Sequence, residues 1–312
     1  MLSQRIQVLS PSLTLAITAL ARDLKAQGRD ILSFSAGEPD FDTPQRVKDA
    51  AITAIQEGCS KYTAVAGTPE VLKAVAGKLK RENNLDYKPS QIVVNVGAKH
   101  SLFNIFQAII DEGDEVIIPS PYWVTYPEIV KYSGGTPVYI ETDESTGFKI
   151  TPAQLKAAIT PKTKVLLFNT PSNPTGSVYS KAELEGLAEV LKGTKILVVS
   201  DEMYEKILFD NLKFTSVASI SEDMYNRTIT VNGLSKSVAM PGWRFGYLAC
   251  PIKEIVDAIV DLQGQSTSNI NTITQKAALP ALNGLVDEDI EAMGDYLIIK
   301  LDQDQINDRI MN

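Results

Sequence analysis

Residues 165–201 read VLLFNTPSNPTGSVYSKAELEGLAEVLKGTKILVVSD, two apolar runs separated by a segment with helical character. The runs at 165–168 and 196–199 are apolar at every position, which is typical of strands buried on both faces. Between them, Ser180-Lys181-Ala182-Glu183 has the spacing of a capping box at the start of a helix. This order of strand, helix and strand predicts a parallel pair of strands covered by a helix.

The same alternation extends in both directions from this segment. Further apolar runs occur at 92–96, 116–118, 138–140, 228–231 and 245–249, with helical segments among them. We therefore predict an α/β fold with a mainly parallel seven-stranded sheet and helices on both faces. Before the sheet, spacing and start signals predict a helix near 12–27 and an extended piece at 31–35. Thr43-Pro44 and Thr68-Pro69 each predict the start of a helix, with the threonine as its cap and the proline as its first residue.

Composition excludes several classes of function. The 312 residues carry a formal net charge of −8, which argues against sequence-independent binding to nucleic acid. One histidine and two cysteines cannot form a zinc site of His and Cys ligands, so we expect no metal. We expect Cys59 and Cys250 to be free thiols in a reducing compartment. Because the sequence has no signal peptide and no long apolar run, we predict a cytoplasmic protein with no membrane partner.

Polar residues follow several of the predicted strands. Open α/β sheets bind ligands beyond the carboxyl ends of their strands, so these residues are candidates for a site. Gly97-Ala98-Lys99 lies between a strand and a helix, where free backbone N–H groups can bind a phosphate; the alternative is a plain structural turn. Asp201 should lie at the rim of the sheet, where a shielded carboxylate favours a positive partner; the alternative is a helix cap.

Two further segments lie beyond strand ends. The segment 169–176 contains two prolines and a glycine, which fix the backbone and make Asn173 a candidate for a fixed hydrogen-bonding group. After the run at 228–231, Lys236 stands between two serines, with Arg244 eight positions later. Desolvation and nearby cations lower the pKa of an amine, as Schiff-base chemistry requires, and the arginine fork fits a phosphate. The alternative for Lys236 is a solvated surface lysine.

Seven short motifs in this order resemble those of the class I and II aminotransferases, and most of all the bacterial aspartate aminotransferases. These are pyridoxal-phosphate enzymes, and the resemblance implies the large domain of fold type I. The match runs over residues 5 to 295. The motifs are Ser35-Ala36-Gly37-Glu38-Pro39-Asp40-Phe41, Lys61-Tyr62-Thr63, Pro121-Tyr122-Trp123, Asn169 to Gly176, Ser200-Asp201-Glu202-Met203-Tyr204, Ser235-Lys236 and Gly242-Trp243-Arg244-Phe245-Gly246.

The resemblance implies a role for each residue that contacts the cofactor ring. Lys236 would form the Schiff base with the cofactor and later carry the proton at the substrate α-carbon. Asp201 would pair with the pyridine nitrogen and keep it protonated. Asn173 and Tyr204 would hydrogen-bond the phenolic oxygen, and Trp123 would stack on the ring. Lys236, Asp201 and Tyr204 are accordingly the predicted catalytic residues.

The phosphate and the substrate have their own implied residues. By the resemblance, Arg244, Ser235 and the backbone amides of Ala98 and Lys99 would bind the phosphate. Tyr62 would reach the phosphate of a neighbouring subunit, which implies a homodimer. Substrate binding would involve the backbone of Gly37 together with Trp123 and Asn173.

The implied reaction moves an amino group between an L-amino acid, aspartate or glutamate, and a 2-oxo acid. The alternatives are another reaction on the same cofactor, such as β-elimination or decarboxylation, and a catalytically silent cofactor-binding fragment. The last alternative arises because relatives carry a further C-terminal segment with an arginine that binds the substrate α-carboxylate. The tail at 296–312 does not resemble that segment, and Arg309 comes too early to be this arginine.

These observations predict three parts of the chain. Residues 1–44 would be an N-terminal segment that belongs to the small domain, and 45–285 the large domain that binds pyridoxal phosphate. Residues 286–312 would begin a truncated or divergent C-terminal domain, so that the small domain is incomplete.

Overall fold

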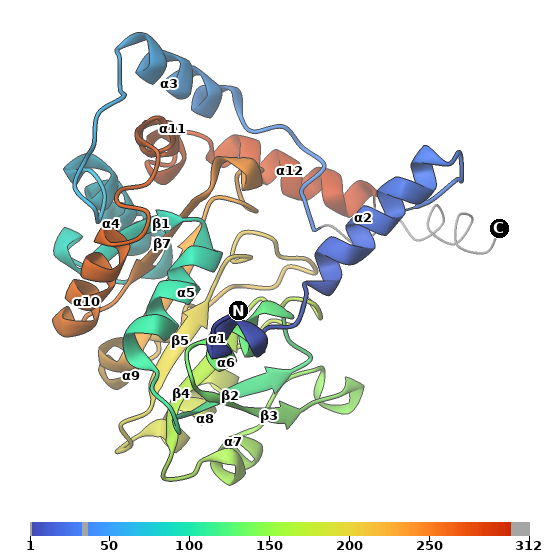
Figure 1. Cartoon of the computed structure of the whole chain (residues 1–312), viewed down its shortest axis with the longest axis vertical. Coiled ribbons are helices and arrows are strands. Elements are labelled where there is room, and N and C mark those ends of the chain that lie inside the picture. Colours follow the sequence, from blue (N-terminus) through green and yellow to red (C-terminus); the bar gives the residue numbers. More distant parts are fainter. Residues whose placement is uncertain (1, 33–36, 301–312) are drawn as a thin grey trace.

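All seven predicted strands are present in one sheet. The structure is a computed structural model that describes residues 2–32 and 37–300 (Figure 1). Each predicted apolar run falls within a strand or overlaps one. The strands are β1 (Ile92–Val96), β2 (Glu115–Ser120), β3 (Thr136–Glu141), β4 (Thr163–Asn169), β5 (Leu197–Asp201), β6 (Thr228–Gly233) and β7 (Phe245–Ala249).

The strand order is β1-β7-β6-β5-β4-β2-β3, and most neighbouring pairs are parallel. The exception is β7, which runs antiparallel to both β1 and β6. It follows β6 after the segment 234–244, which reverses the chain without a crossover helix. The mainly parallel sheet is therefore confirmed, and the reversed direction of β7 is a feature that the apolar runs did not indicate.

Helices cover both faces of the sheet (Figure 1). Successive strand residues point to opposite faces, so Val116 and Ile118 join one core and Ile117 joins another. The first core includes residues of α5 (Ala98–Ile109), α6 (Thr125–Tyr132) and α10 (Lys253–Gly264). The other face is covered by α4 (Pro69–Asn83), α7 (Pro152–Ala158), α8 (Lys181–Leu191), α9 (Glu222–Arg227) and α11 (Thr272–Leu282).

Helix starts follow the predicted signals with one correction. Thr68 caps α4 and Ser180 forms a capping box with Glu183 at the start of α8, as predicted. The helix α3 (Gln45–Gln56) has Pro44 at its N-cap rather than Thr43. The prediction that Thr43 caps this helix is wrong, because its hydroxyl donates to the carbonyl oxygen of Ala239 at 2.8 Å. This bond joins the start of α3 to the segment that follows Lys236.

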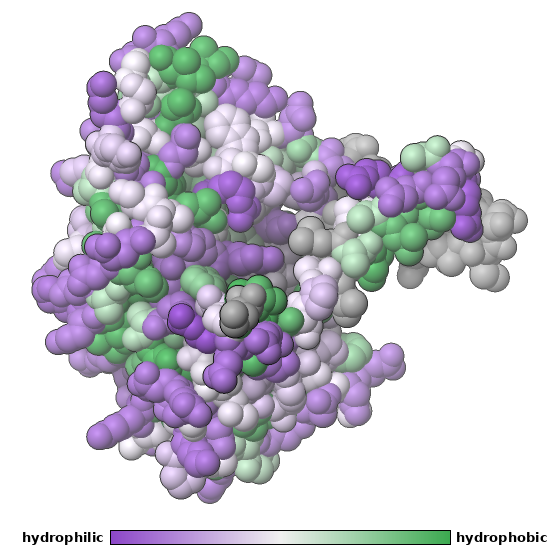
Figure 2. All heavy atoms as spheres, viewed as in Figure 1, coloured by the Kyte–Doolittle hydropathy of each residue, from purple (hydrophilic) through white to green (hydrophobic). Residues whose placement is uncertain are grey.

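The N-terminal part of the chain lies beside the sheet domain. It contains α1 (Gln4–Gln7) and α2 (Leu13–Ala26), and α2 projects from the body as a helix of the predicted extent (Figure 1). Ile17 and Leu20 are 53% and 57% exposed, and Figure 2 shows apolar residues on one side of this projection. Most of the extended piece predicted at 31–35 lies outside the described residues. The chain continues after α11 into α12 (Asp287–Lys300).

Candidate functional site

The segments that follow β4, β5 and β6 meet at one edge of the sheet. The register places Asn169 opposite Asp201, and Asp201 opposite Val231. Because these strands are parallel, their carboxyl ends and the polar residues after them lie together. The Asn169 side-chain amide donates to the carbonyl oxygen of Asp201 at 2.8 Å, and this bond joins the ends of β4 and β5.

Asp201 is a buried carboxylate at the end of β5. Its side chain accepts from the Tyr126 hydroxyl at 2.9 Å and from the Met203 N–H at 3.3 Å, and within residues 2–32 and 37–300 it forms no ion pair. Burial raises the pKa of Asp201 to about 6 from its usual value near 3.8, although both hydrogen bonds oppose this shift. The Met203 bond makes Asp201 the cap of a turn, and no helix of the described residues begins there, so the helix-cap alternative is wrong. Pairing of Asp201 with a positive partner stays a prediction.

Asn173 and Tyr204 come together beside Asp201. The Asn173 N–H donates to the Asn169 side-chain oxygen at 2.6 Å, which fixes the proline-rich segment to the end of β4. The Asn173 amide then donates to the Tyr204 hydroxyl at 3.5 Å. Burial, and secondarily the charge of Asp201, raise the pKa of Tyr204 to about 12. Tyr204 is therefore a neutral phenol that can donate a hydrogen bond at this edge of the sheet.

Lys236 points into the same site from the segment after β6. Its ammonium donates to the carbonyl oxygen of Gly37, and it lies 5.9 Å from the centre of the Tyr204 ring. Burial lowers the pKa of Lys236; the Glu38 carboxylate opposes this shift, and the Arg244 guanidinium adds to it. The reading of Lys236 as a solvated surface lysine is therefore wrong, because the surrounding chain partly removes it from water.

The turn at Gly97 is shaped for close approach. Gly97 has φ of 79° and precedes α5, whose first N–H groups have no side-chain cap. A Cβ at Gly97 would lie 2.5 Å from Nη2 of Arg244, so the guanidinium rests directly on the turn. Arg244 also donates to the carbonyl oxygens of Pro241 at 2.9 Å and Val96 at 3.4 Å. A cation and a helix N-terminus together make an anion-binding site.

Gly246 of β7 supports this turn from below, and its replacement gives a direct test of the packing. A Cβ at Gly246 would overlap the amide nitrogen of Ala98 and the carbonyl carbon of Gly97. Gly246→Ala should lower the free energy of unfolding by about 1–3 kcal/mol, because the backbone of the turn must move. Chemical denaturation would measure the loss. Gly242→Ala is the matched control, since nothing lies within 4 Å of a Cβ there; equal stability of the two variants would contradict the packing argument.

Trp123 and Lys99 lie against each other at the side of the site. The Lys99 ammonium is 4.7 Å from the centre of the Trp123 ring, and the ring packs edge-on against Tyr126 at 5.5 Å. Burial lowers the pKa of Lys99, and the Arg244 charge lowers it further. The sequence assigned only the backbone amide of Lys99 to the site, whereas its side chain also reaches it.

The remaining predicted residues are Ser235, Tyr62 and Arg309, and they do not share one environment. Ser235 is buried, with 8% exposure, beside Lys236. Tyr62 is 91% exposed, so its side chain makes little contact with the described part of its own chain. Arg309 lies outside the described residues. Tyr126 was not predicted: it lies in α6, whereas Trp123 precedes this helix, and its bond to Asp201 depends on the packing of α6.

Comparisons with known proteins agree with this architecture. Residues 29–303 match the family described as aminotransferase class I and II. An aspartate aminotransferase of Bacillus sp. (strain YM-2) is 53% identical over 284 residues, a match that covers 91% of this chain and 72% of the relative. An aspartate/prephenate aminotransferase of Nitrosomonas europaea is 52% identical over 284 residues, which covers 91% of this chain and 71% of the relative.

A solved structure extends the comparison to three dimensions. The aspartate aminotransferase from Thermus thermophilus with maleate superposes with a TM-score of 0.91 at 45% identity. This likeness covers 95% of this chain and 76% of that chain. The family match at 29–303 includes all seven strands and the segments after β4, β5 and β6.

Proposed function

Since this chain belongs to the class I and II aminotransferases, we propose that its amino donor is dicarboxylic, aspartate or glutamate. Enzymes of this family depend on pyridoxal phosphate and move an amino group between an amino acid and a 2-oxo acid. We also propose that the chemistry resides at Lys236, Asp201 and Tyr204. The observation that carries the site assignment is the buried Asp201 carboxylate, which forms no ion pair in the described part of the chain.

The residues around Asp201 fit the ring of the cofactor. When bound, pyridoxal phosphate supplies a ring that accepts electrons from the substrate α-carbon. A buried carboxylate favours a cationic partner, so Asp201 suits the protonated ring nitrogen. Asn173 and Tyr204 would donate hydrogen bonds to the phenolic oxygen. Trp123 would lie against the ring and, with Asn173, border the bound substrate.

The residues around Gly97 fit the phosphate. The Ala98 and Lys99 amides stand at the start of α5, and the Arg244 guanidinium rests on the same turn. Arg244 would bind phosphate oxygens through its planar fork, and the Ser235 hydroxyl would add one further donor. A side chain at position 97 would fill the space beside this guanidinium, which supports placing a bound anion here.

Lys236 would have two tasks. Its amine would hold the cofactor covalently, and after release by the substrate it would take the proton from the substrate α-carbon at Nζ. Both tasks need an uncharged amine, and burial together with Arg244 lowers the pKa of Lys236 in that direction. The Gly37 carbonyl oxygen accepts from the Lys236 ammonium and so directs Nζ into the site, and we propose that the Gly37 backbone also contacts the substrate.

Reduction with borohydride tests this assignment. The chain would be loaded with pyridoxal phosphate, reduced, digested and mapped by mass spectrometry. We expect the label on Lys236, and a label on another lysine would refute the assignment. Product analysis with several amino acids then distinguishes the alternatives: release of ammonia or carbon dioxide without amino transfer would indicate elimination or decarboxylation, and no conversion of any amino acid would indicate a silent cofactor-binding chain.

Positive charge in the site favours a dicarboxylic substrate. Lys99 and Arg244 lie together at one edge of a chain whose net charge is −8. If Arg244 binds the phosphate, the Lys99 ammonium is left to face a second carboxylate on the substrate. The Thermus relative, whose structure contains the dicarboxylate maleate, supports this choice.

Lys99→Met should raise KM for aspartate by about 10–100-fold, because one charge-assisted hydrogen bond is lost. KM for alanine, which has no second carboxylate, should change much less. Steady-state kinetics with both donors measures the ratio. Lys192→Met, at the exposed C-cap of α8, is the control and should leave both values unchanged. An equal change for aspartate and alanine would argue that Lys99 acts on the cofactor alone.

Assembly and organisation remain proposals. We propose a homodimer in which Tyr62 reaches the phosphate of the neighbouring subunit, supported by the 91% exposure of this residue; sedimentation velocity would test the assembly. We also propose the division at 1–44, 45–285 and 286–312. The hydrophobic cores support its first boundary, because their first buried member is Val47, whereas Val286 of the same core lies one residue past the second boundary.

In the described residues, the structure has no helix that is long and apolar enough to cross a membrane. Cytoplasmic localisation is proposed from Cys59 and Cys250, which are free thiols as predicted.

A further inference from the structure

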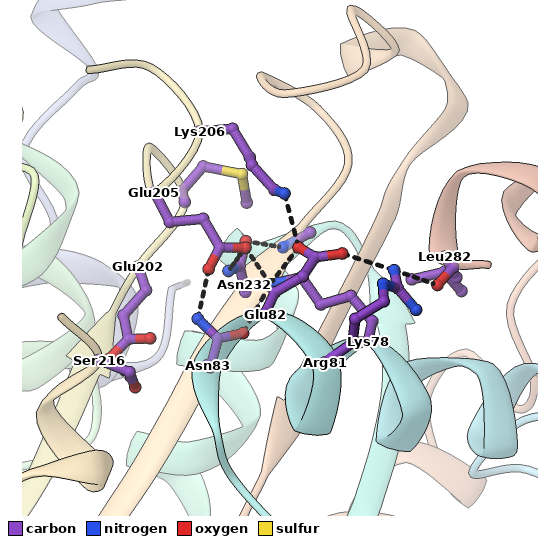
Figure 3. Close-up of polar contacts among 12 residues, drawn as sticks. Lys78, Arg81, Glu82, Asn83, Glu202, Glu205, Lys206, Ser216, Asn232 and Leu282 are labelled. Atoms are coloured by element: carbon purple, nitrogen blue, oxygen red, sulfur yellow. Dashed lines mark hydrogen bonds and ion pairs between the residues drawn. The ribbon is translucent and has the colours of Figure 1, made fainter. Parts of the chain in front are cut away.

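We infer that Glu205 is a positioning residue that holds the segment of Asp201 and Tyr204 against the segment of Lys236. It acts from the face of the sheet that α4 covers. The inference rests on the proposed function, because that function assigns the chemistry to these segments. It adds a residue that contacts neither cofactor nor substrate. The structural basis is a buried polar network between α4, β6 and the residues after β5 (Figure 3).

Glu205 is the centre of this network. Its side chain is buried, with 7% exposure, and accepts hydrogen bonds from three side chains. The Asn83 amide donates to Oε2 at 2.7 Å, and the Asn232 amide donates to Oε1 at 2.8 Å. The Lys78 ammonium also donates to Oε1. Figure 3 shows the Glu205 carboxylate among these groups, with both oxygens occupied.

The partners of Glu205 connect both halves of the site. Glu205 directly follows Tyr204 in the chain, so its side chain anchors that segment. Asn232 lies in β6, four positions before Lys236, and its side-chain oxygen accepts from the Gly233 N–H at 2.7 Å. The Glu205 carboxylate therefore bonds to β6, the strand that leads to Lys236, while the backbone of Glu205 is joined directly to Tyr204.

The anchor on the other side is α4, which carries none of the residues proposed for the cofactor. Lys78 is buried, with 6% exposure, and its ammonium also donates to the Asn83 side-chain oxygen at 2.9 Å. Nζ of Lys78 lies 3.5 Å from the Glu82 carboxylate, and Nζ of Lys206 lies 2.9 Å from the same carboxylate. Burial opposes the ionisation of Glu82, but Lys78, Lys206 and a further arginine hold the pKa of Glu82 below its usual value. Lys78 and Asn83 thus join Glu205 directly to α4, and the Glu82–Lys206 pair adds a second link between α4 and the residues after β5.

The same three pieces of chain border a small cavity. Its volume is about 20 Å³, and its lining includes Lys78, Glu205, Ser237, Val238 and Tyr247. Ser237 and Val238 directly follow Lys236, so this side of the lysine segment borders a cavity. The hydrogen bonds at Asn232 supplement packing on this side of the lysine segment.

Glu205→Gln tests the inference with little change in shape. In this variant an amide NH₂ group replaces one carboxylate oxygen. This donor group must then face another donor, either that of Asn83 or those of Lys78 and Asn232. At least one bond is then lost, and the two segments can shift relative to each other. Reacting groups misplaced by about 1 Å can cost about 10²-fold in rate, so we expect kcat to fall by about 10–100-fold with KM changed by less than about 3-fold.

The measurement uses the full chain loaded with pyridoxal phosphate. Besides kcat and KM, hydrogen exchange of the segments 201–206 and 231–240 reports their order independently of activity, and both should exchange faster in Glu205→Gln. Asn232→Ala serves as the second variant if Glu205→Gln does not fold, because it breaks the same bridge without leaving a charge unpaired. It should speed exchange in 231–240 and lower kcat in the same direction.

Arg227→Met is the matched control. Arg227 is equally buried, with 9% exposure, and pairs with Asp223 at 2.7 Å, but it precedes β6 at the end opposite Asn232. It should lower stability without faster exchange in 231–240. If Glu205→Gln and Arg227→Met give the same exchange in that segment and the same kcat, Glu205 is merely structural and the inference is overturned. Failure of the proposed function can be told apart from failure of this inference. In that case the borohydride label would fall on a residue other than Lys236, whatever the hydrogen-exchange result.

Discussion

Replacement of Lys236 by alanine is expected to lower kcat for amino transfer by at least about 10³-fold, since proton transfer by a positioned group contributes about 10²–10⁴-fold. The proposed covalent attachment of the cofactor would be lost as well. The effect is large because the site offers no equivalent amine: Lys99 lies against Trp123, and its proposed tasks are to face the substrate side chain and to bind phosphate through its amide. The Lys236 ammonium, by contrast, is directed by the Gly37 carbonyl oxygen.

Single-turnover kinetics with aspartate, together with absorbance of the loaded protein, would measure this loss. Lys236→Arg is the informative partner variant, because it keeps the positive charge but cannot hold the cofactor covalently. We expect it to be nearly as inactive as Lys236→Ala. Ser237→Ala, one residue further along the chain, is the control and should retain most of the activity. Substantial turnover by Lys236→Ala would remove this lysine from the mechanism.

Asp201→Asn is expected to lower kcat by about 10²–10³-fold, the range typical of losing one preorganised electrostatic partner in a water-excluded site. The substitution keeps the shape, and an acceptor oxygen can still face the Tyr126 hydroxyl. What it removes is the charge that would keep the ring nitrogen protonated. A neutral ring accepts electrons less well, so the loss should appear in kcat more than in KM.

The pH dependence of cofactor binding provides a second measurement on the same residue. Burial raises the pKa of Asp201 to about 6, so in the cofactor-free chain this carboxyl is protonated below that pH and ionised above it. The affinity for pyridoxal phosphate should therefore weaken as the pH falls from 7 to 5, because the neutral carboxyl cannot pair with a cation. Equilibrium titration monitored by fluorescence would show this trend, and the difference between wild type and Asp201→Asn isolates it from other titrating groups.

Glu202→Gln is the matched control for Asp201. Glu202 is the next residue, fully buried, and its carboxylate accepts from Ser200 and Ser216 and from the Val217 N–H. Burial, and then the charge of Glu205, raise the pKa of Glu202 to about 7. The variant should change stability but leave kcat within about 3-fold, because this side chain bonds to none of the residues proposed for the cofactor. Equal losses in the two variants would indicate general disruption rather than loss of the Asp201 charge.

Much of the fold could be predicted because its signals are local. Apolar runs such as 165–168 and 196–199 become β4 and β5, and Ser180 caps α8 through side chains three residues apart. The exceptions involve distant partners. Thr43 leaves its expected helix cap because Ala239, far along the chain, offers a carbonyl oxygen. The direction of β7 likewise depends on pairing with β1 and β6, which a run of apolar residues does not encode.

The candidate site divides in the same way. Lys236, Asp201, Asn173 and the turn at Gly97 could be singled out, because each follows a predicted strand and polar residues at strand ends gather at one edge of a parallel sheet. Tyr126 could not, since its bond to Asp201 depends on how α6 packs. The side-chain position of Lys99 over Trp123 and the exposure of Tyr62 also became known only from the folded chain.

By itself, the sequence determined the class of fold, the family likeness and the residue types available for chemistry, because strand runs, caps and short motifs are properties of neighbouring residues. Tertiary structure alone decided which of these residues meet. The electrostatics belong to it as well: burial raises the pKa of Asp201 and lowers that of Lys236, and burial depends on the packing of α5, α6 and the lysine segment around them. The Glu205 network has the same origin, since it joins residues 78, 205 and 232, which only the folded sheet brings into contact.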